Sequence, residues 1–375
     1  MIEKLYIGAI SGTSVDGLDI SLISIKGNKV NFLSAKTVSF DSDLKEKLLS
    51  LGQSATISID DLGAIDAELG MVIGSSINCF LTDLSIESSS IVAIGSHGQT
   101  IRHRPEMQSP FTMQIGDPNR IAETTAITCI ADFRRRDIAA GGQGAPLVPP
   151  FHEALFRSSQ QNRVILNIGG ISNITILPAA IERPPTGFDT GPGNALMDSW
   201  ISHQKNIPFD EKGKWAASGK TSSTLLSLLM EDPYLVKPPP KSTGREHYNL
   251  EWLKKHLRSQ DIAPEDVQAT LLDFTASTIV SAVTKWGSFC ENLIVCGGGR
   301  LNTALLQRIK ELSSFTISVA EDHDVDGDSV ESGAFAWLAH QTLSKKSGNQ
   351  IAVTGAKGPR ILGAIHPGLP PKLSI

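Results

Sequence analysis

The stretch IGAISGTSVDGLDI, residues 7–20, sets small hydroxyl side chains, glycines and two aspartates between two apolar runs. Gly12 and Gly17 tolerate positive φ angles, so the turn can direct several backbone N–H groups at phosphate oxygens. Because phosphates repel a bare carboxylate, Asp16 or Asp19 favours a divalent cation between the two. The stretch predicts a nucleoside triphosphate site. The competing interpretation is a polar hairpin turn with aspartate at its usual position.

Two more strand-to-glycine junctions have the same character. The sequence NIGGISN, residues 167–173, offers a second concave backbone centred on Gly169 and Gly170. The three consecutive glycines at 297–299 would let the chain lie flat against a planar or bulky ligand such as an adenosine. Each junction alone is a weak signal, but three of them on strand ends of one chain strengthen the nucleotide interpretation.

The sequence GFDTGPGNALMD, residues 187–198, places Asp189 on a rigid turn beside a helix expected to start near Asn194. A carboxylate held in this way can accept a proton from an attacking oxygen. The alternative is that Asp189 only braces the turn. We expect Asp198, further along the same helix, to be structural.

Three further segments could contact a ligand. In SHGQT, residues 96–100, His97 and Gln99 follow an apolar strand, and Gln143 is the long side chain of the loop GGQGAPLVP. We predict ligand hydrogen bonds for these residues; a catalytic Ser-His pair is disfavoured because adjacent residues rarely face each other and no GxSxG elbow is present. In DFRRRD, one of the arginines at 134–136 could clamp a carboxylate or phosphate, and at least one should be solvated.

One motif is misleading. The sequence GKWAASGKT, residues 213–221, ends like a phosphate-binding P-loop, but five residues separate Gly213 from Gly219 where the motif requires four. No strand-like run leads into it. We therefore exclude a P-loop fold.

The elements that must position these residues follow from apolar periodicity and turn signals. The two halves of the chain begin with similar hairpins about 155 residues apart, at 5–25 and 163–177, which suggests duplicated α/β domains with a nucleotide between them. The segment KPPPKSTG from Lys237 can only be an extended loop. Other expected elements are a third strand at 30–40, a short strand at 91–96 ending at His97, a strand at 292–296, and helices at 44–51, 59–84 and 304–312.

Composition limits the class of protein. A chain of 375 residues favours two domains, and a net charge of −5 argues against nucleic acid or an anionic membrane as the main partner. The N-terminal sequence lacks the order of a signal peptide, and no window is expected to approach the roughly 20 apolar residues of a membrane span. Four scattered cysteines without CxxC spacing predict neither a disulfide framework nor a zinc site. We expect a soluble cytoplasmic protein.

Eight blocks, collinear from about Tyr6 to Pro367, together resemble the anhydro-N-acetylmuramic acid kinase family. They are GAISGTSVDGLD, SHGQTIRH, ADFRRRDIAAGGQGAPLVP, NIGGISNIT, FDTGPGNALMD, KSTGREHYN, CGGGRLN and DGDSVESGAFAWLA. The family belongs to the sugar kinase, actin and Hsp70 superfamily. The resemblance implies an α/β fold with two ribonuclease H-like domains of the actin/hexokinase type and an interdomain ATP cleft. We expect the N-terminal lobe at 1–128 plus 350–375 and the C-terminal lobe at 129–349.

The resemblance also assigns roles to residues. It implies Asp189 as the catalytic residue, and ATP with Mg²⁺ as cofactors, the metal bound by Asp16 directly or through water. The ATP-binding residues it implies are Gly12, Thr13, Ser14, Val15, Asp16, Gly17, Leu18, Asp19, Gly169, Gly170, Gly298, Gly299 and Asn302. The substrate residues are His97, Gln99, Gln143, Gly191, Asn194 and Glu331. Two departures from the family pattern are Ile10, where Met is usual, and an insert around Pro184-Pro185; neither touches the chemistry.

The activity implied by the resemblance is opening of 1,6-anhydro-N-acetylmuramic acid by water with phosphorylation of O6, in peptidoglycan recycling. Glycoside hydrolysis ordinarily needs two carboxylates, but here the γ-phosphoryl group can capture the departing O6, so one carboxylate suffices. The family also implies a homodimer. Two alternatives are another sugar or acyl kinase on this fold and a non-catalytic actin-like or chaperone-like ATPase; the chain has no spare domain for a polymer interface or a peptide-binding module.

Overall fold

The computed structural model describes residues 2–12, 15, 17–54, 56–180, 182–245, 247–257, 261–287 and 289–369. The chain forms two compact units, unit 1 comprising Met1–Leu155 and Asp324–Ile375, and unit 2 comprising Phe156–His323. These limits differ from the expected lobes at 1–128 plus 350–375 and 129–349. The reason is that β6 (Cys129–Ala131) pairs with the sheet of unit 1, and α12 (Val330–Leu343) packs on that same sheet.

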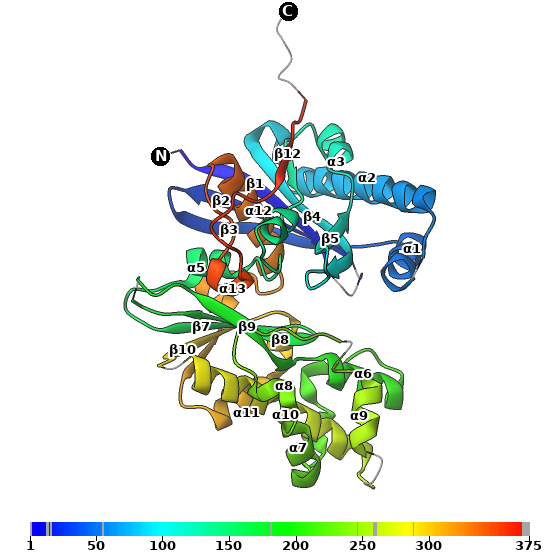
Figure 1. Cartoon of the computed structure of the whole chain (residues 1–375), viewed down its shortest axis with the longest axis vertical. Coiled ribbons are helices and arrows are strands. Elements are labelled where there is room, and N and C mark those ends of the chain that lie inside the picture. Colours follow the sequence, from blue (N-terminus) through cyan, green and yellow to red (C-terminus); the bar gives the residue numbers. More distant parts are fainter. Residues whose placement is uncertain are drawn as a thin grey trace, which may run out of the picture. The chain divides into compact units, whose positions relative to one another are not determined.

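The sheet of unit 1 has the order β12-β6-β4-β1-β2-β3, with β5 paired to β4 (Figure 1). β1, β2 and β3 are antiparallel neighbours, whereas β4 and β6 run parallel to β1. The remaining strands are β1 (Lys4–Ser11), β2 (Gly17–Lys26), β3 (Lys29–Ser39), β4 (Ile91–Arg104), β5 (Phe111–Ile115) and β12 (Ala364–His366). The expectation that the strand starting at Ile91 ends at His97 was wrong, because β5 pairs with β4 as far as Arg104.

Helices cover both faces of this sheet. Ile7 and Ala9 of β1 pack in one core with Leu69 and Ile73 of α2, whereas Gly8 faces α12. Figure 1 shows α2 and α3 side by side. The helices of this part of the chain are α1 (Ser42–Gln53), α2 (Ile59–Asp83), α3 (Pro118–Thr125), α4 (Arg135–Ala139), α5 (Pro149–Phe156) and α13 (Ile351–Thr354), besides α12.

By length and hydropathy alone, α2 could cross a membrane, so the expectation that no window approaches a membrane span was too strong. Its buried side chains recur at Ile65, Leu69, Ile73 and Ile77, and they lie in the core shared with β1. An apolar stripe of this kind is typical of a helix that covers a sheet. We interpret α2 as a core helix.

Unit 2 repeats the topology of unit 1. Its sheet has the order β11-β10-β7-β8-β9, with β7, β8 and β9 antiparallel and β10 and β11 parallel to β7. Three antiparallel strands followed by two parallel ones form the ribonuclease H-like arrangement, so the duplicated α/β fold is confirmed. The strands are β7 (Arg163–Ile168), β8 (Ile171–Leu177), β9 (Thr186–Pro192), β10 (Asn292–Cys296) and β11 (Thr316–Val319).

The core of unit 2 lies between this sheet and its helices. It includes Leu166 and Phe188 from the sheet, Phe274 from α10 and Leu305 from α11. The helices are α6 (Ala195–Lys205), α7 (Ser223–Met230), α8 (Pro233–Val236), α9 (Leu250–Leu257), α10 (Pro264–Trp286) and α11 (Thr303–Leu312). Residues 237–244 carry neither helix nor strand, as expected of the KPPPKSTG segment.

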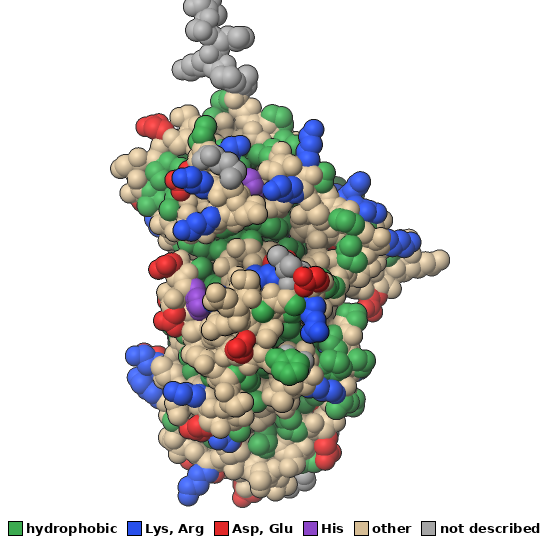
Figure 2. Space-filling view, turned by 90° about the vertical axis from the view of Figure 1, so that its left-hand side faces the viewer, with side chains coloured by type: hydrophobic (Ala, Val, Ile, Leu, Met, Phe, Trp, Pro, Cys, Tyr) green, Lys and Arg blue, Asp and Glu red, His purple; other side chains and the backbone are tan. Residues whose placement is uncertain are grey.

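Charge is spread over the surface. On the face shown in Figure 2, lysine and arginine side chains are interspersed with aspartate and glutamate, and neither sign forms a continuous patch. This agrees with the modest net charge of −5. Nothing on that face resembles the basic stripe of a nucleic-acid-binding surface.

Candidate active site

In unit 2, the second glycine turn is fixed to the turn that follows Asp189. The backbone N–H groups of Gly193 and Ala195 donate to the carbonyl of Gly170 at 2.9 and 3.0 Å, and that of Asn194 donates to the carbonyl of Gly169 at 2.9 Å. A Cβ on Gly193 would lie 2.4 Å from the same Gly169 carbonyl, so only glycine permits this approach. The predicted residues Gly169, Gly170 and Asn194 are thus brought together.

Asp189 lies on β9 opposite Asn173 and is half-buried. Its Oδ2 accepts a hydrogen bond from the backbone N–H of Thr243 at 3.0 Å, and its own N–H donates to the carbonyl of Lys241 at 3.3 Å. The hydroxyl of Tyr234 donates to the Asp189 carbonyl at 2.7 Å. The KPPPKSTG segment therefore orients this carboxylate, which is what a general base requires.

Gly191, two residues further on, has a φ of 153°, and a Cβ there would contact Leu235 and Thr278 at 3.4 Å. Its nearest neighbours are thus in unit 2 itself. We expect it to shape the turn more than to bind a ligand through its own atoms.

The triple glycine packs on the end of β7. A Cβ on Gly297 would lie 2.3 Å from Asn167 Oδ1, and one on Gly299 would lie 2.2 Å from Ile168 Cγ2. A Cβ on Gly298 would meet nothing within 4 Å, so this glycine leaves open space beside its backbone. Asn302 is buried and caps α11, its Oδ1 accepting from the N–H of Leu305 at 3.0 Å. Of the three predicted adenosine contacts, Gly298 has the most accessible surroundings.

In unit 1, the first glycine loop joins β1 to β2. The N–H of Val15 donates to the carbonyl of Gly12 at 3.1 Å, and Val15 has a φ of 55°. Val15 and Leu18 are core residues, so only their backbones could meet a ligand; Gly17 likewise packs against the carbonyl of Val38. The predicted residues Thr13, Ser14 and Asp16 lie outside the described part of the chain.

Asp19 is the described carboxylate nearest this loop in the chain. Its Oδ1 accepts a hydrogen bond from Thr37 at 2.6 Å. Desolvation raises its pKa, and Asp328 and Asp326 raise it further against the opposing Thr37 bond. Converging negative charge of this kind would be offset by a cation.

The described residues do not form an all-protein metal site. They contain no group of three or more His, Cys, Asp or Glu side chains that could hold a metal ion. Mg²⁺ usually binds through one or two carboxylates together with waters and substrate phosphates. Asp19 and its acidic neighbours fit that pattern, in which the nucleotide supplies most of the ligands.

Of the three consecutive arginines, Arg134 is the one directed at other candidate residues. Its Nε donates to His97 Nε2 at 2.9 Å and its Nη1 to the carbonyl of Gly144 at 2.9 Å. Desolvation lowers the pKa of Arg134 to about 10, against the effect of Glu331, which raises it. Arg135 and Arg136 are exposed, as expected of a solvated face.

His97 is buried, and both of its ring nitrogens already have protein partners. Because Nε2 accepts from Arg134, the proton lies on Nδ1, which donates to the Gly98 carbonyl at 2.9 Å. Desolvation and the Arg134 charge hold the pKa of His97 well below its usual value. This geometry favours a role in positioning Arg134 over direct contact with a ligand.

The other predicted substrate residues of unit 1 differ in their exposure and in their hydrogen-bond partners. Gln99 is buried and accepts from the Ser11 hydroxyl at 2.5 Å. Gln143 is exposed, and its side chain has no hydrogen-bond partner among the described residues. Glu331, in the first turn of α12, is solvent-accessible; desolvation and Asp19 raise its pKa, whereas Arg134 lowers it. Gln143 and Glu331 are therefore available to a ligand.

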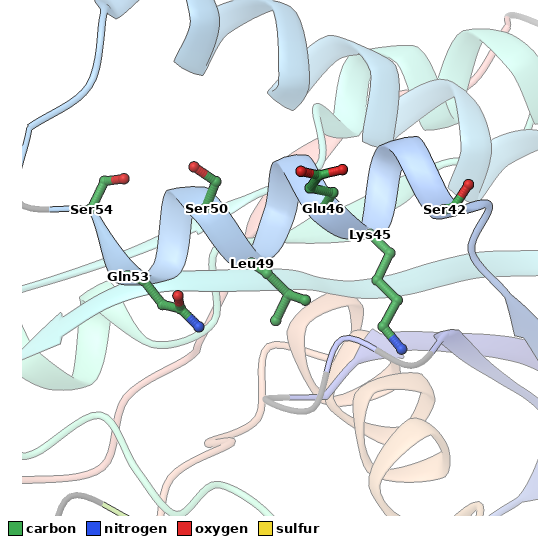
Figure 3. A pocket seen from close by; sticks show the side chains of 7 residues that line it. All are labelled: Ser42, Lys45, Glu46, Leu49, Ser50, Gln53 and Ser54. Atoms are coloured by element: carbon green, nitrogen blue, oxygen red, sulfur yellow. The ribbon is translucent and has the colours of Figure 1, made fainter.

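Two of the cavities differ in their relation to the predicted site. One of about 580 Å³ is lined by seven residues of α1 and the position after it, and none of them is a predicted site residue (Figure 3). Another, of about 450 Å³, adjoins the Asp189 support and includes Tyr234 and Thr243.

Sequence comparison decides the family. The sequence model of the family described as anhydro-N-acetylmuramic acid kinase matches residues 4–368. The chain belongs to this family.

Curated relatives agree with that membership over nearly their whole length. The anhydro-N-acetylmuramic acid kinase of Xylella fastidiosa is 47% identical over 97% of this chain and 96% of that protein. Proteins of the same name from Coxiella burnetii and Xanthomonas oryzae are 47% and 45% identical, each covering at least 97% of both chains. A solved structure, the activator of the 2-hydroxyisocaproyl-CoA dehydratase from Clostridium difficile, matches with a TM-score of 0.45 and 10% identity over 92% of this chain and 99% of that chain, a likeness too low to bear on function.

Sequence reasoning missed several residues that the structure places beside the predicted site residues. Tyr234, Lys241 and Thr243 support Asp189, and Asp137 holds the loop that carries Gln143, accepting from the Gly144 N–H at 2.8 Å. The block KSTGREHYN was itself a signal, because its resemblance to the family pattern indicated that this loop has a role. The block lies about 50 residues from Asp189 in the chain, so the sequence did not show that the two are in contact.

Proposed function

We propose that this protein is an ATP-dependent kinase that opens 1,6-anhydro-N-acetylmuramic acid with water and phosphorylates O6. The products are N-acetylmuramic acid 6-phosphate and ADP, in the recycling of cell-wall peptidoglycan. The observation that carries this function is the match to the family over residues 4–368, with Asp189 held by three backbone and side-chain contacts on its turn.

Asp189 acts as the general base. Water bonds to C1 of the sugar while the C1–O6 bond breaks, and the Asp189 carboxylate takes the proton from that water. O6 bonds to the γ-phosphorus, and the bond from that phosphorus to the β–γ bridging oxygen breaks, leaving ADP. The Thr243 N–H keeps one carboxylate oxygen in place, so the base needs no reorientation as it reacts.

The sugar is recognised by residues of unit 1. Arg134, aligned by His97, supplies a cation for the carboxylate of the muramic acid side chain, and Gln143 and Glu331 hydrogen-bond the sugar or the water. Backbone groups around Gly12, Gly169 and Gly298 contact ATP. Asp19, and Asp16 outside the described residues, would hold Mg²⁺, which when bound would offset phosphate charge.

The wider setting belongs to the same proposal. We expect the enzyme to be cytoplasmic and homodimeric, with the sugar and ATP as its partners and neither nucleic acid nor membrane involved. The dispersed surface charge of Figure 2 argues against a nucleic-acid partner, and the core packing of α2 argues against a membrane span. The two lobes are proposed to close on ATP during catalysis.

A reaction in ¹⁸O-labelled water tests the function. Purified protein, Mg²⁺-ATP and the anhydro sugar are mixed, and the sugar product is read by mass spectrometry. We expect ¹⁸O at C1 of a 6-phosphorylated product. Asp189→Asn should lower the rate by about 10²- to 10⁴-fold, the usual effect of losing a general base. Asp60→Asn, at an exposed position of α2, is the matched control and should keep full activity.

Other products would point elsewhere. A phosphorylated sugar with an intact anhydro bridge would make this an ordinary hydroxyl kinase. ATP turnover without any sugar product, unchanged in Asp189→Asn, would reject the kinase and favour a switch ATPase.

A further inference from the structure

The guanidinium of Arg245 lies directly against the second glycine turn. A Cβ placed on Gly170 would be 2.8 Å from Arg245 Nε and 2.9 Å from its Nη2. The absence of a side chain at position 170 is thus what lets the arginine approach. Arg245 is exposed, and within the described part of the chain its guanidinium has no hydrogen-bond partner. A cation in this position is available to an anion.

The segment that carries Arg245 also supports the catalytic aspartate. The Thr243 N–H donates to Asp189 Oδ2, and Arg245 follows Thr243 by only two residues, so their backbones are within about 7 Å. The backbone of Arg245 is therefore near the contact that holds the carboxylate at which the reaction is proposed to begin.

The polar neighbours of Arg245 in the described part of the chain leave its guanidinium without a fixed partner. Asp198, in the first turn of α6, interacts electrostatically with it, and this lowers the pKa of Asp198 against the larger effect of desolvation. No hydrogen bond between the two side chains fixes the arginine. Lys241, the cation of the segment nearest to Arg245 in the chain, already donates to the carbonyls of Tyr234 and Leu235 at 3.2 and 3.0 Å. Arg245 is thus the better placed of the two to bind a ligand.

We propose that Arg245 is a further catalytic residue that binds the transferred γ-phosphoryl group beside the Gly169-Gly170 turn, an assignment that rests on the function proposed above. A guanidinium presents parallel N–H donors that match phosphate oxygens, and an arginine that stabilises charge in phosphoryl transfer can accelerate it by about 10³- to 10⁵-fold.

Steady-state kinetics of Arg245→Met and Arg245→Lys test the proposal, with Arg183→Met, an exposed arginine of the same unit, as matched control. We expect Arg245→Met to lower kcat by about 10²-fold or more, with Arg245→Lys intermediate, because lysine keeps the charge but not the paired donors. The KM of the sugar and the Kd of ADP should stay within about threefold of wild type, since neither ligand carries the γ-phosphoryl group.

Two further measurements exclude a merely structural role. Free guanidinium ion should restore part of the kcat of Arg245→Ala, which loss of packing would not allow. Gly170→Ala should displace Arg245 and so lower kcat. In a protein that already carries Arg245→Met, the same Gly170→Ala change should have a much smaller effect on kcat, because the arginine is no longer present.

The outcomes separate this inference from the function itself. If wild type makes no phosphorylated sugar, the proposed function fails. If wild type is active and Arg245→Met matches Arg183→Met, only the role of Arg245 fails. An equal loss of ADP and ATP affinity with kcat unchanged would also overturn the γ-phosphoryl assignment.

Discussion

At the scale of single residues, Asp198 shows how burial makes a carboxyl sensitive to pH. Its pKa is raised from 3.8 to about 6, mainly by desolvation. The Arg245 charge lowers this pKa, and the Asp210 charge makes a smaller contribution that raises it. Because the folded protein binds this proton more tightly than the unfolded chain, the free energy of unfolding falls as pH rises from 3.8 towards 6. Above pH 6 the folded protein carries the full cost of the ionised, partly buried Asp198 carboxylate.

Asp198→Asn should therefore stabilise the protein at neutral pH. The pKa shift of Asp198 corresponds to a gain of at most about 3 kcal/mol in the free energy of unfolding. Because the carboxyl is partly exposed, we expect a gain of about 1–3 kcal/mol at pH 7.5. At pH 4.5 the gain should shrink to about a third, since the folded carboxyl is then protonated. Urea unfolding of both proteins at the two pH values measures this. An equal gain at both would mean that ionisation of Asp198 is not the cause.

At the scale of elements, the contact of α12 with the sheet of unit 1 sets the place of Glu331. Cβ atoms on Gly8 and Gly95 would lie 1.8 Å from the Ser332 carbonyl and 1.9 Å from the Phe335 carbonyl. Both clashes are with backbone, which cannot rotate away. The helix can approach β1 and β4 so closely only because both positions are glycine, and Glu331 immediately precedes Ser332.

Gly8→Ala should force α12 away from the sheet. We expect the free energy of unfolding to fall by about 3 kcal/mol and the KM of the sugar to rise, because Glu331 moves with the helix. Gly63→Ala, on an exposed position of α2 with nothing within 4 Å of its Cβ, should instead stabilise by about 0.5–1 kcal/mol. Urea unfolding and steady-state kinetics would show both. A Gly8→Ala protein as stable as wild type would contradict the packing argument.

At the scale of the whole molecule, the two units differ in how the chain builds them. Unit 2 is one continuous segment, Phe156–His323, with its own five-stranded sheet and core. Unit 1 needs two segments, because β12 pairs with β6 and α12 covers β1 and β4. A continuous segment with its own core is the part of a chain able to fold alone.

A fragment of residues 156–323 should therefore unfold cooperatively in urea, whereas a fragment of residues 1–155 should not. The second fragment would expose the glycine-lined face of β1 and β4 and leave one edge of β6 without its partner. Circular dichroism during urea titration distinguishes the two. A cooperative transition in the 1–155 fragment would show that α12 is dispensable for folding.

The sequence by itself determined the local features of this protein. Glycine between apolar runs predicted the hairpins at β1–β2 and β7–β8, and their repetition predicted the duplicated α/β fold, because turn chemistry and strand periodicity depend on neighbouring residues. Asp189 stood out for the same reason, as a carboxylate set in a turn of glycine and proline.

Only the tertiary structure decided which distant side chains meet. It distinguished Arg134 from its two neighbours by a contact with His97, 37 residues away in the chain, and it brought Arg245 to Gly170. It also extended β4 past His97, through pairing with β5, and assigned α12 to unit 1. These contacts depend on strand order and on the paths of loops, which no local pattern encodes, because the residues share only a place in the folded chain.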